Sequence, residues 1–563
     1  MMWNRKYVIY GANRIAKDFM YIFDKLNIVY LIDDKTDVVV FGGKMVYAVE
    51  RVGEIRDFDA VIICDIDKEA KSVKLEQYGL LYGQDYYFEE DLFYLLDKVK
   101  IPSDKEVIVW GTGRIAGRYF SDSDIPISFY VDSDERKSVF NQRAVRRPWE
   151  IKNWNRYFVI IAVKESVEIE EYLINHDMKR DGDFTKYDNV LCSLLLRKTM
   201  FDSNYYGFSC ATMLNHLEVV RGGDVWCCCT TFMGIGLGNM MKSSVEKVWR
   251  STLHKILCLS TENHTYTFCD KSMCPLFVNK RPSIQNGVPE EDYRIMESMP
   301  KAVAIGYDSS CNLICRTCRD KICVATGKEA EQLNGITDMV IEKLLPEAEF
   351  LVLAGDGEVF VSRAYEKIYN SDKTDDMKYI RILSNGTLFS KKNWEKFAVH
   401  KKGKIMLTFS IDAATKETYE KIRRNGNFDI LKKNMEFASE LRRMGRVSFL
   451  RLNFVVQKEN YKEMIPFVEW AENLGADAVF FTKVLNWGTF TEEEFKEISM
   501  MEEDGITPKR ELAQVLESPV MKKDIVDLGT IQYMHDEASD EAIENYYMWE
   551  LEKKNRGLFE EFT

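Results

Sequence analysis

Three cysteines carry the strongest chemical signal in the sequence, in the order Cys311-Asn-Leu-Ile-Cys315-Arg-Thr-Cys318. The preceding segment AVAIGYDSS predicts an apolar strand that runs into a loop. Thiolates hold iron-sulfur clusters because soft sulfur matches iron, and four ligands complete a cubane. Because only three thiols stand here, the fourth iron of a 4Fe-4S cluster would stay open to a chelating ligand. The spacing therefore predicts a 4Fe-4S site with one exchangeable position.

This CxxxCxxC motif at the end of a first strand resembles the cluster motif of radical S-adenosylmethionine (SAM) enzymes, and the resemblance extends over residues 301–490. The segment GDGE resembles the family's GGE motif after the second strand, which holds the SAM amino group. YIRILSNGTL, IMLTFSIDAA, FLRLNFVVQKEN and ADAVFFTKV are similar to strands three to six. The resemblance implies a partial (β/α)6 barrel with Cys311, Cys315 and Cys318 as catalytic ligands. The residues that it implies for SAM are Gly355, Gly357, Glu358, Ser384, Asn385, Ser410, Asp412 and Arg423.

The chemistry that the resemblance implies begins with one electron from the reduced cluster, which a flavodoxin- or ferredoxin-type donor supplies. The electron cleaves SAM to methionine and a 5′-deoxyadenosyl radical, and this radical abstracts a hydrogen atom from the substrate. The protein's part is to position the substrate and to exclude water. A non-catalytic iron-sulfur scaffold or redox sensor is the alternative of a different class, but it needs no SAM pocket. An NAD-dependent sugar oxidoreductase would need a Tyr-Lys or Cys-His arrangement, which we do not find near the glycines of the N-terminal segments.

Eleven of the thirteen cysteines fall between Cys210 and Cys323, and in a reducing compartment they suggest metal ligation more than disulfides. The segment with the GDV turn, the SVEKVW helix and a closing cysteine pair resembles a SPASM-type auxiliary cluster domain, here before the barrel instead of after it. The resemblance implies one auxiliary 4Fe-4S cluster. The alternative metal is zinc held by four thiolates. The alternative ligand is Cys227, which could take the place of Cys228. The ligands that we assign are Cys210, Cys228, Cys269 and Cys274.

The N-terminal part of the chain repeats itself. KYVIYGANRIAKDF is similar to EVIVWGTGRIAGRYF, and four such landmarks recur at an offset of 98 to 100 residues. Each copy predicts an apolar strand, a glycine-containing turn and a helix, so we expect two α/β units with mainly parallel, doubly wound sheets. The pattern also resembles the Rossmann-like domains of bacterial sugar-modifying and capsule-related proteins.

Each turn resembles a dinucleotide fingerprint, and an acid ends the following strand, at Asp33 in the first copy. The second copy is the better site for a nucleotide or nucleotide-sugar, because the Asn13 side chain would crowd a pyrophosphate in the first. The residues that we assign there are Gly111, Gly113 and Asp132. A turn that is kept only for packing is the alternative. We expect a nucleotide-activated sugar or related metabolite as substrate, whereas the SPASM-like segment favours a peptide or protein.

The 563 residues contain 77 Lys and Arg against 90 Asp and Glu, a net charge of −13, which argues against a nucleic-acid partner. No apolar run is long enough to span a membrane, and the start lacks the features of a signal peptide, so we expect a cytoplasmic protein.

The fold class that we predict is α/β multidomain, and the last segment is acidic and helical. The predicted domains are Rossmann-like repeats at 1–100 and 101–198, a SPASM-like domain at 199–285, a radical SAM barrel at 300–490 and a tail at 491–563.

Overall fold

The computed structural model is a mixed α/β fold with three sheets in which most strand pairs are parallel. It divides into two compact units: residues 1–205 with 252–268, and residues 206–251 with 269–563. The residues that the structure describes are 5–34, 39–121, 123, 125–163, 166–201, 210, 212–270, 273–274, 277, 299–353, 356–398, 401, 404–486, 489–503, 505 and 507–531.

The first unit contains two sheets of six strands with the same topology. In the first sheet the order is β3-β4-β2-β1-β5-β6, and in the second it is β9-β10-β8-β7-β11-β12. In both sheets the outermost strand, β3 or β9, is antiparallel to its neighbour and all other pairs are parallel. The strands are β1 (Lys6–Tyr10), β2 (Asn27–Asp33), β3 (Val40–Phe41), β4 (Lys44–Ala48), β5 (Ala60–Ile63), β6 (Tyr86–Phe88), β7 (Glu106–Trp110), β8 (Ile127–Val131), β9 (Val139–Phe140), β10 (Arg143–Arg146), β11 (Tyr157–Ile161) and β12 (Phe184–Lys186).

Buried apolar strands form the centre of each sheet. Val8, Ile9 and Tyr10 of β1 are fully buried, which is typical of a parallel strand covered on both faces. The helices of this unit are α1 (Arg14–Ile22), α2 (Arg51–Glu54), α3 (Lys68–Gln77), η2 (Glu89–Leu96), α4 (Arg114–Phe120), η3 (Pro148–Glu150), η4 (Trp154–Arg156), α5 (Val167–Ile174), η5 (Tyr187–Asn189), α6 (Cys192–Phe201) and α9 (Thr252–Glu262).

Helix α9 lies in this unit although the chain reaches it only after part of the second unit. The Nδ2 atom of Asn263, at the end of α9, donates to Asp18 of α1 at 2.9 Å and to the carbonyl of Thr199 in α6 at 3.2 Å. Most of α9 is buried, from Leu253 to Thr261. The helix is therefore a core element of the first unit.

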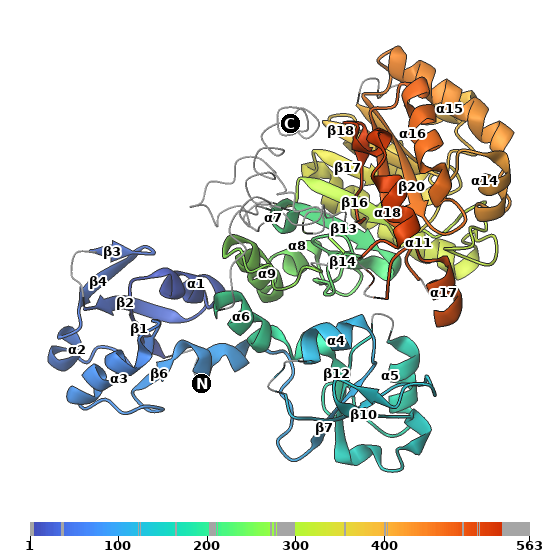
Figure 1. The fold of residues 1–563 in the computed structure, drawn as a ribbon. Coiled ribbons are helices and arrows are strands. Elements are labelled where there is room, and N and C mark those ends of the chain that lie inside the picture. The colour runs from blue at the N-terminus through green and yellow to red at the C-terminus, as the bar shows by residue number, and fades with distance from the viewer. Residues whose placement is uncertain are drawn as a thin grey trace. The chain divides into compact units, whose positions relative to one another are not determined.

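The second unit is built on one ten-stranded sheet in the order β15-β14-β13-β16-β17-β18-β19-β20-β21-β22. Figure 1 labels β13, β14, β16, β17, β18 and β20 of this sheet. From β13 through β16 to β22 every neighbouring pair is parallel. The strands are β13 (His216–Val220), β14 (Asp224–Trp226), β15 (Gly238–Asn239), β16 (Ala302–Gly306), β17 (Phe350–Leu353), β18 (Tyr379–Ser384), β19 (Ile405–Ser410), β20 (Phe449–Val456), β21 (Ala478–Lys483) and β22 (Val526–Asp527).

The six strands predicted within 301–490 are present as β16 to β21, in chain order and with helices between them. Burial alternates along β20, where Leu450, Leu452 and Phe454 are buried while the residues between them are partly exposed. The helices of the unit are α7 (Thr212–Asn215), η6 (Arg221–Gly223), α8 (Val245–Trp249), α11 (Gly327–Met339), η8 (Val340–Leu344), η9 (Leu345–Glu347), α12 (Arg363–Tyr369), η10 (Asp372–Thr374), α13 (Lys391–Ala398), α14 (Lys416–Ile422), α15 (Phe428–Arg443), η12 (Tyr461–Glu463), α16 (Met464–Leu474), α17 (Glu492–Ile498), α18 (Arg510–Leu516) and η13 (Pro519–Lys522).

Two features of this unit were not expected from the sequence. The cysteine-rich segment contributes β13, β14 and β15 to the same sheet as β16, and the acidic segment after residue 490 contributes β22. The tail residues 532–563, for which we expect a helix, lie outside the described residues. Among the helices that the structure describes, none combines the length and the apolar character needed to cross a membrane.

Candidate functional site

The three cysteines of the CxxxCxxC motif lie on the loop that follows β16, at the carboxyl end of that strand. Cys311 and Cys315 are buried, with 8% and 7% exposure, whereas Cys318 is exposed. Burial raises the pKa of the Cys311 and Cys315 thiols. In open α/β sheets the carboxyl ends of the strands are where ligands bind.

Backbone contacts hold this cysteine loop against two other segments. The N–H of Cys311 donates to the carbonyl of Cys323 at 2.7 Å. The N–H of Ile314 donates to the carbonyl of Arg424 at 2.9 Å, and the Asn425 side chain donates to the carbonyl of Asn312 at 2.8 Å. The loop is thus fixed both to its own continuation and to the segment after α14.

Each of the three sulfurs accepts a hydrogen bond from a side-chain N–H. Asn385 Nδ2 lies 3.9 Å from Cys311 Sγ, and Arg423 Nη1 lies 3.6 Å from Cys315 Sγ. Arg319 places both Nε and Nη2 at 3.4 Å from Cys318 Sγ. Donors of this kind stabilise the thiolate form of cysteine, which is the form that binds metal.

Glu358 connects the loops after β17 and β18. Its carboxylate is fully buried and accepts from Ser384 Oγ at 2.8 Å and from the Asn385 N–H at 2.7 Å. Burial raises the pKa of Glu358, although these donors act in the opposite direction. Its neighbour Gly357 lies so close to the β16 loop that an added Cβ would stand 2.4 Å from the carbonyl oxygen of Asp308. Gly355, also assigned to SAM, lies outside the described residues.

Asp412 and Arg423 form a buried ion pair after β19. Arg423 Nη2 lies 2.6 Å from Asp412 Oδ2, and Asp412 also accepts from the Val455 N–H at 2.8 Å. Ser410 ends β19 in register with Asn453 of β20. The structure thus brings together Glu358, Ser384, Asn385, Asp412 and Arg423 with the cysteine loop through hydrogen bonds, and it places Ser410 on the neighbouring strand end.

Several buried polar atoms near these strand ends have no hydrogen-bond partner among the residues that the structure describes. They include Asn453 Oδ1, Gln457 Nε2, Thr408 Oγ1 and Arg423 Nε. An unsatisfied buried polar group is costly, so such a group calls for an explanation such as a bound ligand. Gln457 and Arg319 are candidate site residues that the sequence alone does not indicate, because nothing singles out Gln457 within FLRLNFVVQKEN and Arg319 follows the cysteine motif without belonging to it.

Three of the thiols assigned to the auxiliary cluster lie within electrostatic range of the fourth, Cys228. The pKa of Cys228 is raised well above its ordinary value, first by burial and then by the neighbouring thiols of Cys210, Cys269, Cys229 and Cys274. Cys227 is fully buried, and among the thiols only Cys210 contributes to its raised pKa. In the described part of the chain, no three His, Cys, Asp or Glu side chains are grouped so that they could hold a metal ion.

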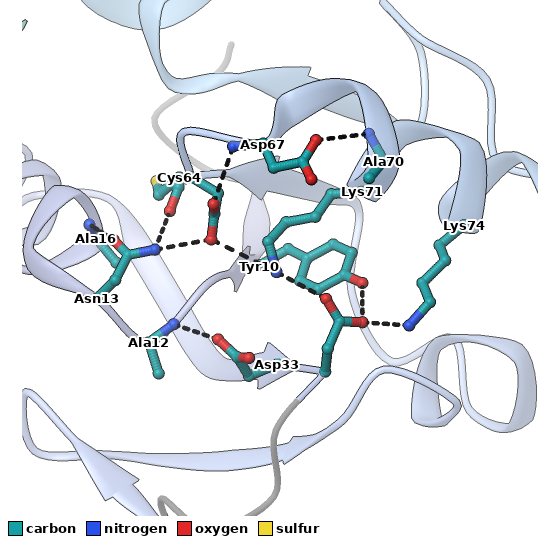
Figure 2. Close-up of polar contacts among 12 residues, drawn as sticks. Tyr10, Ala12, Asn13, Ala16, Asp33, Cys64, Asp67, Ala70, Lys71 and Lys74 are labelled. Atoms are coloured by element: carbon teal, nitrogen blue, oxygen red, sulfur yellow. Dashed lines mark hydrogen bonds and ion pairs between the residues drawn. The ribbon is translucent and has the colours of Figure 1, made fainter.

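The glycine turn of the first repeat is filled by the chain's own side chains (Figure 2). Asn13 caps α1, and its Nδ2 donates to the Cys64 carbonyl and to Asp65, both at 2.9 Å. Asp33 accepts the Ala12 N–H at 2.7 Å, so the free N–H that a phosphate would use is already bonded. The Asn13 side chain therefore occupies this turn.

A charged cluster surrounds the same strand ends. Lys71 lies 3.0 Å from Asp34 and 3.6 Å from Asp65, and its Nζ stands 3.9 Å from the centre of the Tyr10 ring. Burial acts to raise the pKa of Asp34, but bonds from Lys74, Tyr10 and Lys71 lower it to about 2. The carboxylate of Asp34 therefore balances the charges of Lys71 and Lys74.

The glycine turn of the second repeat is more open. A Cβ added at Gly113 would meet nothing within 4 Å, and this residue caps α4 without a side chain. Asp132 accepts from Thr112, from the Asp134 N–H at 2.9 Å and from Lys137 at 3.3 Å. Burial acts to raise the pKa of Asp132, but these donors hold it below its ordinary value. At Gly111 the added Cβ would stand 2.9 Å from a carbonyl oxygen, so this glycine serves a close backbone approach.

Neither a family model nor a curated protein matches the sequence. Among solved structures, SuiB of Streptococcus suis bound to S-adenosylmethionine is 17% identical, over 41% of this chain and 50% of its own, with a TM-score of 0.29. AnSMEcpe with bound AdoMet and Cp18Cys peptide is 18% identical, over 35% of this chain and 54% of its own, with a TM-score of 0.27. The chain therefore spans about half the length of these structures. With TM-scores this low, the likeness carries no functional conclusion for this chain.

Proposed function

We propose that this chain is a radical SAM enzyme whose catalytic 4Fe-4S cluster is held by Cys311, Cys315 and Cys318. The observation that carries the proposal is the N–H donor directed at each of the three sulfurs, because hydrogen bonds to cysteine sulfur are how proteins orient and tune cluster ligands. A cubane binds each thiolate at a different iron atom, so these ligands need not converge on one point. When bound, the cluster and SAM supply a carbon-centred radical that removes a hydrogen atom from the substrate.

The chain's own residues have two tasks in this proposal. Glu358 holds the loops that carry Ser384 and Asn385, so it fixes the wall of the SAM site. Asn453 Oδ1 and Gln457 Nε2, which have no hydrogen-bond partner within the described part of the chain, offer an acceptor and a donor to a polar ligand such as SAM. These loops would also exclude water from the reacting carbon.

The test is SAM cleavage by the anaerobically reconstituted protein. With dithionite in place of the flavodoxin- or ferredoxin-type donor, we expect 5′-deoxyadenosine and methionine in equal amounts, even without substrate. Cys315→Ala should abolish this product, whereas the control Cys323→Ala should retain it, because Cys323 meets Cys311 through backbone atoms. A protein that holds iron and sulfide but never cleaves SAM would support a redox sensor or scaffold instead.

We further propose that Cys210, Cys228, Cys269 and Cys274 hold one auxiliary 4Fe-4S cluster. The support is that the other three thiols all act on the pKa of Cys228. Wild-type protein should then contain about eight iron and eight sulfide per chain, and Cys228→Ala about four of each. Cys227→Ala is the control variant, since that thiol is the direct neighbour of Cys228 and is itself buried, and it should leave the iron content unchanged. About four iron and one zinc in the wild type would assign these cysteines to zinc.

For the substrate, we propose a nucleotide-activated sugar or related metabolite that binds at the second repeat. The support is the open space at Gly113, which contrasts with the filled turn at Asn13 in the first repeat. Mass spectrometry of extracts from cells with and without the protein tests this proposal. A sugar nucleotide that changes mass supports it, whereas a peptide or protein that changes mass would assign the chain to the peptide-modifying class.

A further inference from the structure

Arg319 follows the third cysteine of the motif directly and is held in place by contacts with two loops. Its Nε and Nη2 atoms donate to Cys318 Sγ, both at 3.4 Å. Its Nη1 atom donates to the carbonyl of Ser309 in the loop after β16, and its Nη2 atom also donates to the carbonyl of Asp356 in the loop after β17. The planar guanidinium therefore has fixed backbone acceptors on one side and a cysteine sulfur on the other.

The charge of Arg319 is not cancelled by a carboxylate. No Asp or Glu in the described part of the chain forms an ion pair with it, whereas Arg423 is paired with Asp412 and Arg316 with Glu459. Arg319 thus stays a full cation next to the exposed member of the three thiols.

We propose that Arg319 is a positioning residue that fixes Cys318 and raises the reduction potential of the cluster, an inference that rests on the proposed radical SAM function. In reduction one electron passes from the donor to the cluster, and no bond forms or breaks. The electron makes the cluster more negative, so a cation hydrogen-bonded to one of its thiolates stabilises the reduced form more than the oxidised form. Without Arg319, the cluster would be harder to reduce.

The test is the midpoint potential of the reconstituted cluster, followed by electron paramagnetic resonance in a redox titration without SAM. Arg319→Gln removes the charge and keeps a donor, whereas Arg319→Lys keeps the charge and loses the planar fork. Arg316→Gln is the matched control, because this arginine lies on the same loop and its guanidinium pairs with Glu459 at 3.3 Å. We expect a more negative potential in Arg319→Gln, a smaller shift in Arg319→Lys and the wild-type potential in Arg316→Gln.

The outcomes separate this inference from the proposed function. If the Arg319→Gln variant does not hold the cluster, the potential is measured in the Arg319→Lys variant instead. A potential below that of the wild type in this variant supports the proposal. A loaded variant of Arg319 with the wild-type potential overturns it, and so does the loss of the cluster from both variants. Failure of the proposed function would appear elsewhere, as a wild-type protein that holds no cluster at Cys318 or produces no 5′-deoxyadenosine.

Discussion

The buried ion pair between Arg423 and Asp412 should contribute strongly to the stability of the second unit. The two side chains are only 12% and 3% exposed, and their charged atoms lie 2.6 Å apart. Removing one partner of a buried pair leaves the other charge uncompensated and costs about 3–5 kcal/mol, whereas replacing both partners is often nearly neutral. We therefore expect Arg423→Met to lower the free energy of unfolding by about 3–5 kcal/mol, and the double variant with Asp412→Asn to recover most of this loss.

Asn is the suitable replacement at position 412 for two local reasons. Asp412 has a φ of 68°, a left-handed conformation that Asn tolerates better than most residues. The Oδ1 atom of an Asn can also keep the bond from the Val455 N–H, which is 2.8 Å long. The double variant thus removes the ion pair together with the bond from Arg423 to Cys315 Sγ.

The assay is urea unfolding of the iron-free protein, in a double-mutant cycle that uses the tryptophan fluorescence of the second unit. Arg442→Met is the matched control, because its bidentate pair with Asp477 is 33% and 24% exposed, and it should cost about 1 kcal/mol or less. If Arg423→Met costs no more than Arg442→Met, or if the double variant loses the sum of both single changes, the reasoning from burial is refuted.

Two further predictions concern a pH response and a close backbone contact. Burial raises the pKa of Glu89 from 4.5 to about 7 although Lys68 acts to lower it, so the folded state holds a proton that the unfolded chain releases. The free energy of unfolding should therefore fall by about 3 kcal/mol as the pH rises from 4.5 to 7, at 1.36 kcal/mol per pKa unit. Urea unfolding across this pH range measures the fall, and the Glu89→Gln variant should not show it. Gly357→Ala should destabilise the second unit by about 1–3 kcal/mol, because its Cβ would stand 2.4 Å from the Asp308 carbonyl. Gly335→Ala, within α11, should instead stabilise the second unit by about 0.5–1 kcal/mol in urea unfolding. If the Gly357 and Gly335 variants change stability equally, the close contact between position 357 and the Asp308 carbonyl is contradicted.

The strands of the second unit could be predicted because each is a short apolar run with a clear end. YIRILS and IMLTFS become β18 and β19 over Tyr379–Ser384 and Ile405–Ser410. The parallel pairing of β13 with β16 could not be predicted, since it joins segments about 85 residues apart in the sequence. Pairing over such a distance depends on the whole fold and leaves no local pattern.

Helix α9 shows a second limit. Its residues Thr252–Glu262 are apolar on most faces, so the pattern indicates a buried helix but not which core buries it. Its position in the chain places it in the cysteine-rich domain predicted at 199–285, whereas it belongs to the first unit. Chain order is a weak guide when a segment leaves one unit and returns to it.

The candidate site could be predicted only as far as its motifs reach. The cysteines, Glu358 and Asp412 belong to segments whose order and spacing carry the resemblance, so the sequence indicates them. Arg319 belongs to no such pattern, because its role arises where the carbonyls of Ser309 and Asp356 meet its guanidinium. A basic residue on a loop is usually an exposed surface residue, and only the fold distinguishes the exception.

The two arginines beside the cysteine sulfurs should also differ in what they contribute. Arg423 forms an ion pair with Asp412, so its charge and that of its partner largely cancel at Cys315, and its main effect is to hold that thiol in place. Arg319 has no carboxylate partner among the described residues, so its field at Cys318 is that of a full charge. The field of a single charge also falls off more slowly with distance than that of a pair. If the proposed cluster binds at these cysteines, Arg319 would act on all of its iron atoms, whereas Arg423 would act mainly on one ligand.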